Sequence, residues 1–274
     1  MMINNKPQCI VFSKDRPMQL QAYLDSLFWY TDITPEDTYV IVDQLKWYTY
    51  LQNQDVNFVC EAYFDSSFIH TLMHAVESCD TSRPILFGCD DVVFTNFVNI
   101  TSLYSCIEDD DTVAGLSLRL GRNIYPRPEN HQFTRLTPFL QKWHYKNYLG
   151  CRHWGWPFEL MASVYPRELV YKIIESEPDK IRNPNYLEGV GVEYMARQNT
   201  TQSQLACLCF DSCVVGMDVN RVQDTHPNRT NGTEQQDVDY LKTQFSLGKR
   251  LNWKKLFGVR TNDVFVGDRY WELI

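Results

Sequence analysis

The chain has 274 residues, of which 44% are hydrophobic and 14% aromatic, and its formal net charge is −8. That length suits one large α/β domain or one domain with an appendage. The acidic balance argues against a general nucleic-acid-binding or anionic-membrane-binding role, because the field of the protein would repel a polyanion. The polar N-terminus leads directly into a short apolar run, and no apolar stretch reaches the roughly 18 residues of a membrane span. We therefore expect a cytoplasmic protein without a transmembrane segment.

Short apolar runs alternate with helical patterns through the first third of the chain. Such alternation predicts an α/β fold with a mostly parallel central sheet that is flanked by helices. Ligands of these folds bind beyond the carboxyl ends of the strands. We expect strands at residues 8–13, 38–42, 56–62 and 85–87, and helices at residues 17–30, 46–53 and 66–78.

The second half begins with an irregular stretch, residues 119–158, that is rich in aromatic, basic and proline residues. A long segment of this kind is typical of a functional excursion. A second alternating block follows it, and a polar tail ends the chain. We expect strands at residues 159–165 and within 203–215, and helices at residues 166–175, 188–198 and 234–247.

Two adjacent carboxylates, Asp90 and Asp91, follow the apolar run that ends at Cys89, and the run itself contains no basic residue. An ionised carboxylate beside apolar surroundings is costly unless a cation or several hydrogen-bond donors compensate it. Divalent cations take oxygen ligands and are commonly held by one or two carboxylates together with phosphates. The pair therefore indicates a metal site at a strand end, and a pair of turn-capping aspartates is the alternative.

Four segments together carry a resemblance to the nucleotide-sugar-dependent glycosyltransferases of the GT-A fold, broadly of the family-2 type. They are residues 9–17 (CIVFSKDRP), the Asp90-Asp91 strand end, residues 183–189 (NPNYLEG) and residues 220–229 (NRVQDTHPNR). The resemblance implies a Rossmann-like GT-A sheet. It also implies metal-dependent transfer of a sugar, with inversion, from a nucleoside diphosphate sugar with UDP as the carrier to a glycan or glycosylated acceptor.

The same resemblance implies a division of the chain. Residues 1–233 would form the GT-A catalytic domain, with a nucleotide-sugar-binding half at 1–118 and an acceptor and catalytic half at 119–233. Residues 234–274 would form a C-terminal extension packed on that domain.

For the donor, the resemblance assigns Asp91 to a Mn²⁺ or Mg²⁺ ion and Asp90 to the nucleotide ribose or an amide. Such an ion neutralises charge that develops on the departing diphosphate. Cys89 stands where the family often has another acid, so metal binding would depend more heavily on Asp91 and on His226, a loop histidine that the resemblance places at the metal or the diphosphate. The other donor-binding candidates are Ser13, Lys14, Asp15, Arg16, Asp43 and Arg221.

An inverting transferase needs a base that accepts the proton of the acceptor hydroxyl. Glu188 stands where the family has its acidic motif, and the glycines that follow it permit close backbone approach. The alternative is a helix-terminal acid that is stabilised by the helix dipole. Glu193 is the reserve candidate for the base.

Aromatic residues alternate with basic ones between residues 133 and 158, and they form the candidate acceptor region because flat rings pack on the C–H faces of sugars. Trp154 and Trp156 are the first candidates, since Gly155 between them allows close approach. The alternatives are core packing of these rings and stacking on single-stranded nucleic acid, which the acidic composition disfavours.

Two other functions compete with glycosyl transfer. A sugar nucleotidyltransferase would share a similar sheet, but the chain lacks the glycine-rich basic N-terminal loop typical of that class. A catalytically silent sugar- or nucleotide-binding module is the second alternative, and Cys89 in place of an acid keeps it open.

Overall fold

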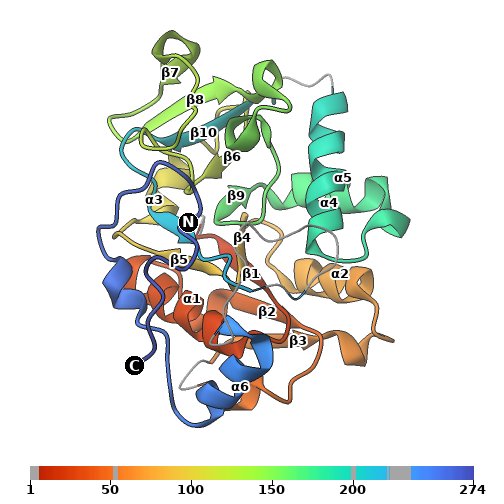
Figure 1. Cartoon of the computed structure of the whole chain (residues 1–274). Helices are drawn as coiled ribbons and strands as arrows, with labels where there is room; N and C mark the ends of the chain where they lie inside the picture. Colours follow the sequence, from red (N-terminus) through yellow and green to blue (C-terminus); the bar gives the residue numbers. More distant parts are fainter. Residues whose placement is uncertain (1–5, 52–54, 199–201, 221, 223–235) are drawn as a thin grey trace.

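The computed structural model describes the chain except for residues 1–5, 52–54, 199–201, 221 and 223–235. Its strands and helices alternate along the first half of the chain (Figure 1). The strands are β1 (Gln8–Ser13), β2 (Thr38–Val42), β3 (Asn57–Cys60), β4 (Ile85–Cys89), β5 (Val92–Phe94), β6 (Val113–Ser117), β7 (Phe133–Arg135), β8 (Leu140–His144), β9 (Ser163–Tyr165), β10 (Gln204–Leu208) and β11 (Val214–Gly216). The α-helices are α1 (Pro17–Tyr30), α2 (Phe68–Ser78), α3 (Ile100–Ser105), α4 (Arg167–Ser176), α5 (Pro184–Arg197) and α6 (Val238–Ser246).

The described residues form a nine-stranded sheet in the order β3-β2-β1-β4-β9-β6-β10-β8-β7, together with a two-stranded sheet of β11 and β5. Strands β1 to β4 are parallel to one another. Strand β9 lies antiparallel between β4 and β6, so β6 and its parallel neighbour β10 run in the same direction as β4. The predicted α/β fold with a mostly parallel central sheet is confirmed.

The first elements match their predicted bounds because local signals mark them. A proline opens α1, where its missing N–H costs nothing. The helix predicted at residues 46–53 is wrong for its described part, residues 46–51, where only a short 3₁₀ helix at Tyr48–Tyr50 forms.

Helix α5 begins at Pro184, four residues before the predicted start. The Asn183 side chain accepts a hydrogen bond from the Tyr186 N–H at 3.2 Å and so caps the helix. Asparagine at the cap and proline in the first turn are both favoured at a helix start. The sequence therefore carried this signal one turn before the glutamate at which the helix was predicted to begin.

Strand β1 illustrates how the sheet is buried on both faces. Cys9 and Val11 join one apolar cluster, and Ile10 and Phe12 join the other, as the two-residue period of a strand requires. The first cluster includes residues of α1, α3 and α6, and the second includes residues of α2, α4 and α5. The helices thus cover both faces of the sheet, and each large apolar side chain buried this way contributes about 1.5–3 kcal/mol.

The C-terminal extension contacts the sheet region at several places. Helix α6 lies beside α1 (Figure 1). The Gly216 N–H of β11 donates to the Val264 carbonyl at 2.8 Å, and the Val266 N–H donates to the Gly216 carbonyl at 2.9 Å. The predicted boundary at residue 118 stays a prediction, although strands from both sides of it share the nine-stranded sheet.

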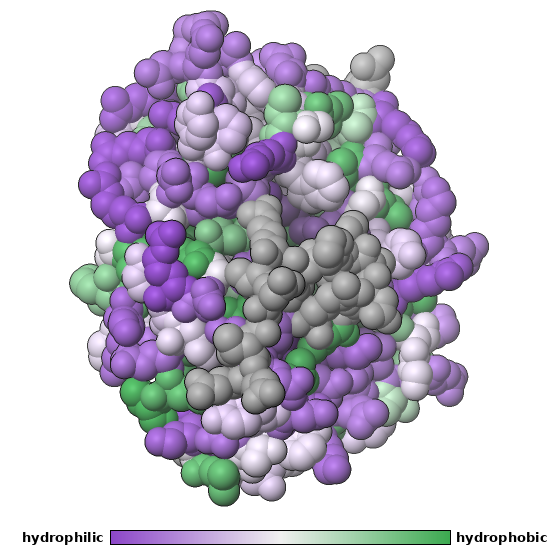
Figure 2. Space-filling view, viewed as in Figure 1, coloured by the Kyte–Doolittle hydropathy of each residue, from purple (hydrophilic) through white to green (hydrophobic). Residues whose placement is uncertain are grey.

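Hydrophilic residues cover most of the described surface on the face shown in Figure 2, and hydrophobic residues are scattered between them. Across the part of the chain that the structure describes, no helix is both long and apolar enough to cross a membrane.

Candidate active site

A cavity of about 770 Å³ lies at the carboxyl edge of the parallel strands. The loops after β1, β2, β3 and β4 contribute to its wall, as do the first residues of α5. Strands that run in parallel bring their carboxyl ends to one edge, which explains why residues far apart in sequence meet there. Its lining consists of Phe12, Ser13, Lys14, Arg16, Ile41, Asp43, Glu61, Phe68, Cys89, Asp91, Arg182, Asn183, Pro184, Asn185, Tyr186, Asn220 and Val222.

Arg16 supplies the cation that the two aspartates lack in their own segment. One guanidinium nitrogen pairs with Asp90, and another lies 3.2 Å from an Asp91 carboxylate oxygen. The charge of the aspartates is therefore compensated by a side chain from the loop after β1. This pairing removes the charge argument for a metal, and the predicted metal site at Asp91 stays a prediction.

Asp90 is completely buried and bound on both sides. The Ser13 hydroxyl donates to its carboxylate at 2.8 Å, and Arg16 donates to the other oxygen. Burial raises the pKa of Asp90 to about 6, against the opposing effect of Arg16. The structure does not bring Asp90 to the cavity, where it was predicted to face the nucleotide ribose or an amide, because no part of the residue reaches the surface. Its carboxylate instead binds Ser13 and Arg16.

Asp91 differs from its neighbour because its side chain is 21% exposed and lines the cavity. Its backbone carbonyl accepts the Met217 N–H at 2.7 Å, which fixes the residue to the chain after β11. No group of three or more His, Cys, Asp or Glu side chains suited to a metal occurs among the described residues. Asp91 fits the kind of site in which one carboxylate shares a divalent ion with phosphate and water oxygens.

Residues of two other segments contact the rest of the loop after β1. The Ser13 and Tyr48 hydroxyl oxygens are 2.8 Å apart. Lys14 lines the cavity, whereas Asp15 pairs with Lys242 of α6 at 3.2 Å. Ser13, Lys14 and Arg16 are thus brought together at the cavity as candidates for donor contacts, and Asp15 faces the C-terminal extension.

Two carboxylates mark the end of the cavity near β2 and β3. Asp43 follows β2 and Glu61 follows β3, and the register pairs Val42 with Cys60, so the two acids are neighbours at the sheet edge. Burial raises the pKa of both carboxyl groups, with further contributions from Asp15 at Asp43 and from Asp43 at Glu61. Glu61 was missed by the sequence analysis, because the predicted strand at residues 56–62 included it, whereas β3 ends at Cys60.

The start of α5 forms the opposite wall. Asn183, Pro184, Asn185 and Tyr186 line the cavity, and the helix that they begin has 14 residues. The positive end of the helix dipole makes such a terminus favourable for an anion, although Pro184 has no backbone N–H and the Tyr186 N–H is bonded to the Asn183 side chain. Together with Lys14 and Arg16, this wall makes the cavity suitable for a phosphorylated ligand.

Glu188 lies in the second turn of α5, half-buried, and one of its carboxylate oxygens accepts the Leu160 N–H at 2.9 Å. Burial raises the pKa of Glu188 to about 7, and the nearby charges of Glu159 and Asp91 also raise it, while Arg119 and the Leu160 N–H oppose the rise. Its position past the first turn, and its bond to a loop instead of to the helix start, disfavour the helix-terminal alternative.

Beneath Glu188 lies a buried pair that the sequence analysis did not find. Arg119 follows β6, and its Nε lies 3.4 Å from the Glu159 carboxylate. Glu159 accepts the Met161 N–H at 2.6 Å and the Ser163 hydroxyl, so it shapes the turn whose Leu160 N–H holds Glu188. The strand before Arg119, β6, was not predicted from the sequence, so its end gave no signal for this residue.

Glu193, the reserve base, lies on the surface. Its carboxylate pairs with Arg197 at 2.8 Å one helical turn later, and both side chains are more than half exposed. The structure does not bring it to the cavity, so its assignment as a base is corrected.

The two candidate acceptor tryptophans have different environments. The Trp154 ring is 2% exposed and packs against Trp143, with ring centroids 5.2 Å apart. Trp156 is 40% exposed. Gly155 is required for another reason than the predicted one, because a Cβ there would lie 1.6 Å from the Tyr148 carbonyl oxygen. An acceptor role for Trp154 is therefore wrong, while Trp156 keeps an open ring.

The remaining sequence-based candidates are Arg221 and His226. Both fall outside the described residues.

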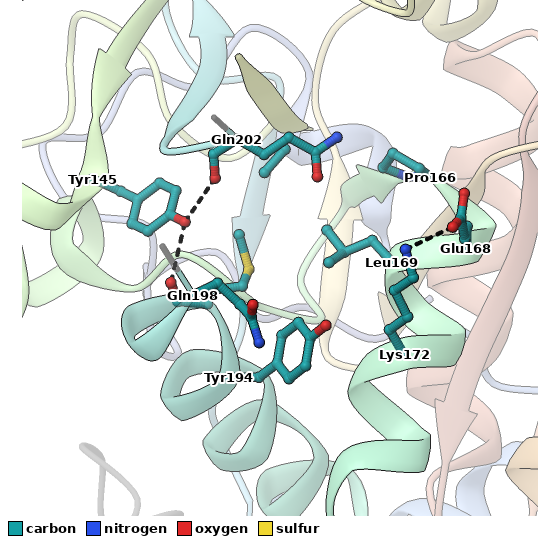
Figure 3. Close-up of a pocket in the computed structure, with 10 residues that line it drawn as sticks. Tyr145, Pro166, Glu168, Leu169, Lys172, Tyr194, Gln198 and Gln202 are labelled. Carbon is teal, nitrogen blue, oxygen red and sulfur yellow. Dashed lines mark hydrogen bonds and ion pairs between the residues drawn. The ribbon is translucent and has the colours of Figure 1, made fainter. Parts of the chain in front are cut away.

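A second, smaller cavity of about 150 Å³ lies near the other end of α5, between that helix and α4 (Figure 3). Tyr194 and Gln198 of α5 and Lys172 of α4 line it, and Lys172 pairs with Glu168 at 2.6 Å (Figure 3). None of the sequence-predicted site residues lines this cavity.

No protein-family model matches the chain. The chain is similar to the bifunctional glycosyltransferase pgtA of Dictyostelium discoideum, with 25% identity over 261 residues that cover 82% of this chain. The match covers 33% of that protein, so the chain spans about a third of its length. The similarity to a glycosyltransferase agrees with the α/β fold and with a cavity suited to a phosphorylated ligand.

Proposed function

We propose that the chain is a glycosyltransferase that moves a sugar from a nucleoside diphosphate sugar to a hydroxyl group of a glycan or glycosylated acceptor. The observation that carries the proposal is the convergence of Arg16, Asp91 and the start of α5 on one cavity of about 770 Å³. A half-buried glutamate with a pKa of about 7 lies one turn farther along the same helix. The similarity to a protein named as a glycosyltransferase supports the same reaction class.

The donor diphosphate would lie between the loop after β1 and the start of α5. Lys14 and Arg16 offer positive charge and side-chain N–H donors on one side, and the positive end of the α5 dipole lies on the other. Asp91 would share a Mn²⁺ or Mg²⁺ ion with the diphosphate, and such an ion supplies charge neutralisation for the leaving group. Because Arg16 already contacts Asp91, the guanidinium and the carboxylate act on the same part of the ligand.

Glu188 is the group suited to the proton transfer. Its carboxylate would accept the proton of the acceptor hydroxyl as that oxygen forms a bond to the anomeric carbon. The bond from that carbon to the diphosphate oxygen breaks, and the diphosphate leaves with the electron pair. A base opposite the leaving group gives inversion, and a pKa near 7 keeps part of the carboxylate ionised at neutral pH while leaving it basic enough to accept a proton.

The base of the donor would lie near Asp43 and Glu61. Carboxylates accept hydrogen bonds, so this end of the cavity suits a ring N–H or ribose hydroxyls. Uridine, with its ring N–H, is the first candidate through the resemblance stated for the sequence. Trp156 is the described aromatic candidate for the acceptor side.

A donor screen tests the proposal directly. The purified chain is incubated with UDP-, GDP-, dTDP- and CMP-linked sugars and a panel of glycan acceptors, with and without Mn²⁺ or Mg²⁺, and mass spectrometry detects the free nucleotide and the product. We expect release of a nucleoside diphosphate and a product of inverted configuration, with loss of turnover in Asp91→Ala at unchanged melting temperature. Nucleotide binding without turnover would favour a binding module, and a retained configuration would remove the base role of Glu188.

A further inference from the structure

Helix α6 of the C-terminal extension reaches the loop that lines the donor cavity. The Lys242 ammonium group lies 3.2 Å from the Asp15 carboxylate and 3.0 Å from Asp239 in its own helix. The Lys242 side chain is only 10% exposed. An ion pair with a partly buried lysine is screened less than a surface pair, so it can fix the position of Asp15.

Asp15 needs such a support because of its backbone. Its φ angle is 54°, in the left-handed region that residues other than glycine rarely adopt. Such a conformation is unfavourable and persists only where its surroundings enforce it. Asp15 stands between Lys14 and Arg16, which both line the cavity, so its conformation sets the direction of the two cations.

The extension also contacts residues 47–50, which pack against the loop after β1. The Lys242 ammonium lies 5.5 Å from the centre of the Trp47 ring. The neighbouring Tyr48 hydroxyl contacts the Ser13 hydroxyl at 2.8 Å, and Arg250 donates to the Tyr50 carbonyl at 3.3 Å. The extension therefore contacts the donor loop directly and also through residues 47–50.

We propose that Lys242 is a positioning residue for the donor: by holding Asp15, it aims Lys14 and Arg16 at the diphosphate. The inference rests on the proposed function, because the diphosphate is the ligand for these cations. The inference gives the C-terminal extension a role in donor binding in addition to its packing against α1. The residue touches no reacting atom, so its effect belongs to donor affinity and not to the chemical step.

The test compares Lys242→Met, Lys242→Arg and Lys255→Met with the full-length wild type. Lys242→Met keeps the length of the side chain and removes its charge. Lys255→Met is the matched control, because Lys255 pairs with Glu272 at 3.4 Å in the same extension but on an exposed face. Hydrogen exchange measures the exchange rates of the backbone amides of residues 14–16 without ligand. Calorimetric titration measures the affinity for UDP and GDP.

We expect Lys242→Met to speed exchange at residues 14–16 and to weaken nucleotide binding about tenfold, a change of about 1.4 kcal/mol, with a raised donor KM and a kcat within twofold of wild type. Lys242→Arg should recover most of the affinity, and Lys255→Met should match the wild type.

Asp15→Asn should weaken nucleotide binding by a factor similar to that of Lys242→Met, and the double variant Asp15→Asn/Lys242→Met should weaken it no further. Unchanged exchange in Lys242→Met, or an additive double variant, would overturn the positioning role. A wild type that binds neither nucleotide and turns over no donor of the screen would instead overturn the proposed function, while the exchange data would still decide whether Lys242 holds the loop.

Discussion

The two sides of the candidate active site are built in different ways. On the donor side, charged residues at strand ends satisfy one another, with Arg16 between Asp90 and Asp91. In the segment predicted to bind the acceptor, the aromatic residues divide between the interior and the surface, with Trp154 buried and Trp156 exposed. Charged residues must remain near water or a partner, whereas an aromatic ring is stable in either setting. Charges at strand ends were therefore better guides to the cavity than aromatic composition.

The largest expected effect concerns Glu188, the proposed base. Glu188→Gln should lower kcat by about 10²- to 10⁴-fold, because the amide cannot accept the acceptor proton. Wild-type activity should rise with pH through about 7 as Glu188 ionises, in agreement with its raised pKa. Initial rates from pH 5 to 9 with donor and acceptor in excess test this expectation; a Gln variant with the wild-type rate would exclude Glu188 as the base.

The same carboxyl group has an effect on stability with a defined sign. Its folded-state pKa is raised to about 7 from 4.5, so the folded state binds the proton more tightly than the unfolded state. Glu188 therefore contributes stability at low pH that is lost as pH rises from about 4.5 to 7. Urea unfolding at several pH values should show a flatter dependence in Glu188→Gln over that window, and parallel curves for the two proteins would contradict the assignment.

The next effect separates the two tryptophans. Trp154→Ala should lower the free energy of unfolding by about 3–5 kcal/mol, because it leaves a cavity beside Trp143 in the core. Trp156→Ala should leave stability within about 0.5 kcal/mol and raise the acceptor KM. Chemical denaturation and steady-state kinetics measure the two outcomes. A large stability loss in Trp156→Ala with no change in KM would mean that the acceptor binds elsewhere.

The smallest effect is expected at the reserve base. Glu193→Gln removes one surface ion pair with Arg197, and exposed pairs of this kind contribute about 0.3–0.5 kcal/mol. Its kcat should equal that of the wild type, which makes it the matched control for Glu188→Gln on the same helix. A kcat loss of tenfold or more would restore Glu193 as a candidate.

The sequence by itself determined the first elements of the chain and the edge of the sheet where ligands bind. Strand β1 and helix α1 matched their predicted bounds, because apolar runs and a proline in the first helical turn act locally. The residues after β1, β2 and β4 followed as cavity residues, since parallel strands place their carboxyl ends together. These inferences need only neighbours in the chain and the geometry of a parallel sheet.

Only the tertiary structure decided which groups compensate one another. Arg16 and Asp90 are separated by 74 positions, and Lys242 and Asp15 by 227. The environment of Glu188 likewise depends on Leu160, which lies in another loop. Charge compensation and burial act through space, so no pattern along the chain determines which pairs form. The sequence located the carboxyl edge, and tertiary contacts decided which of its carboxylates face the cavity and which are buried to hold its wall.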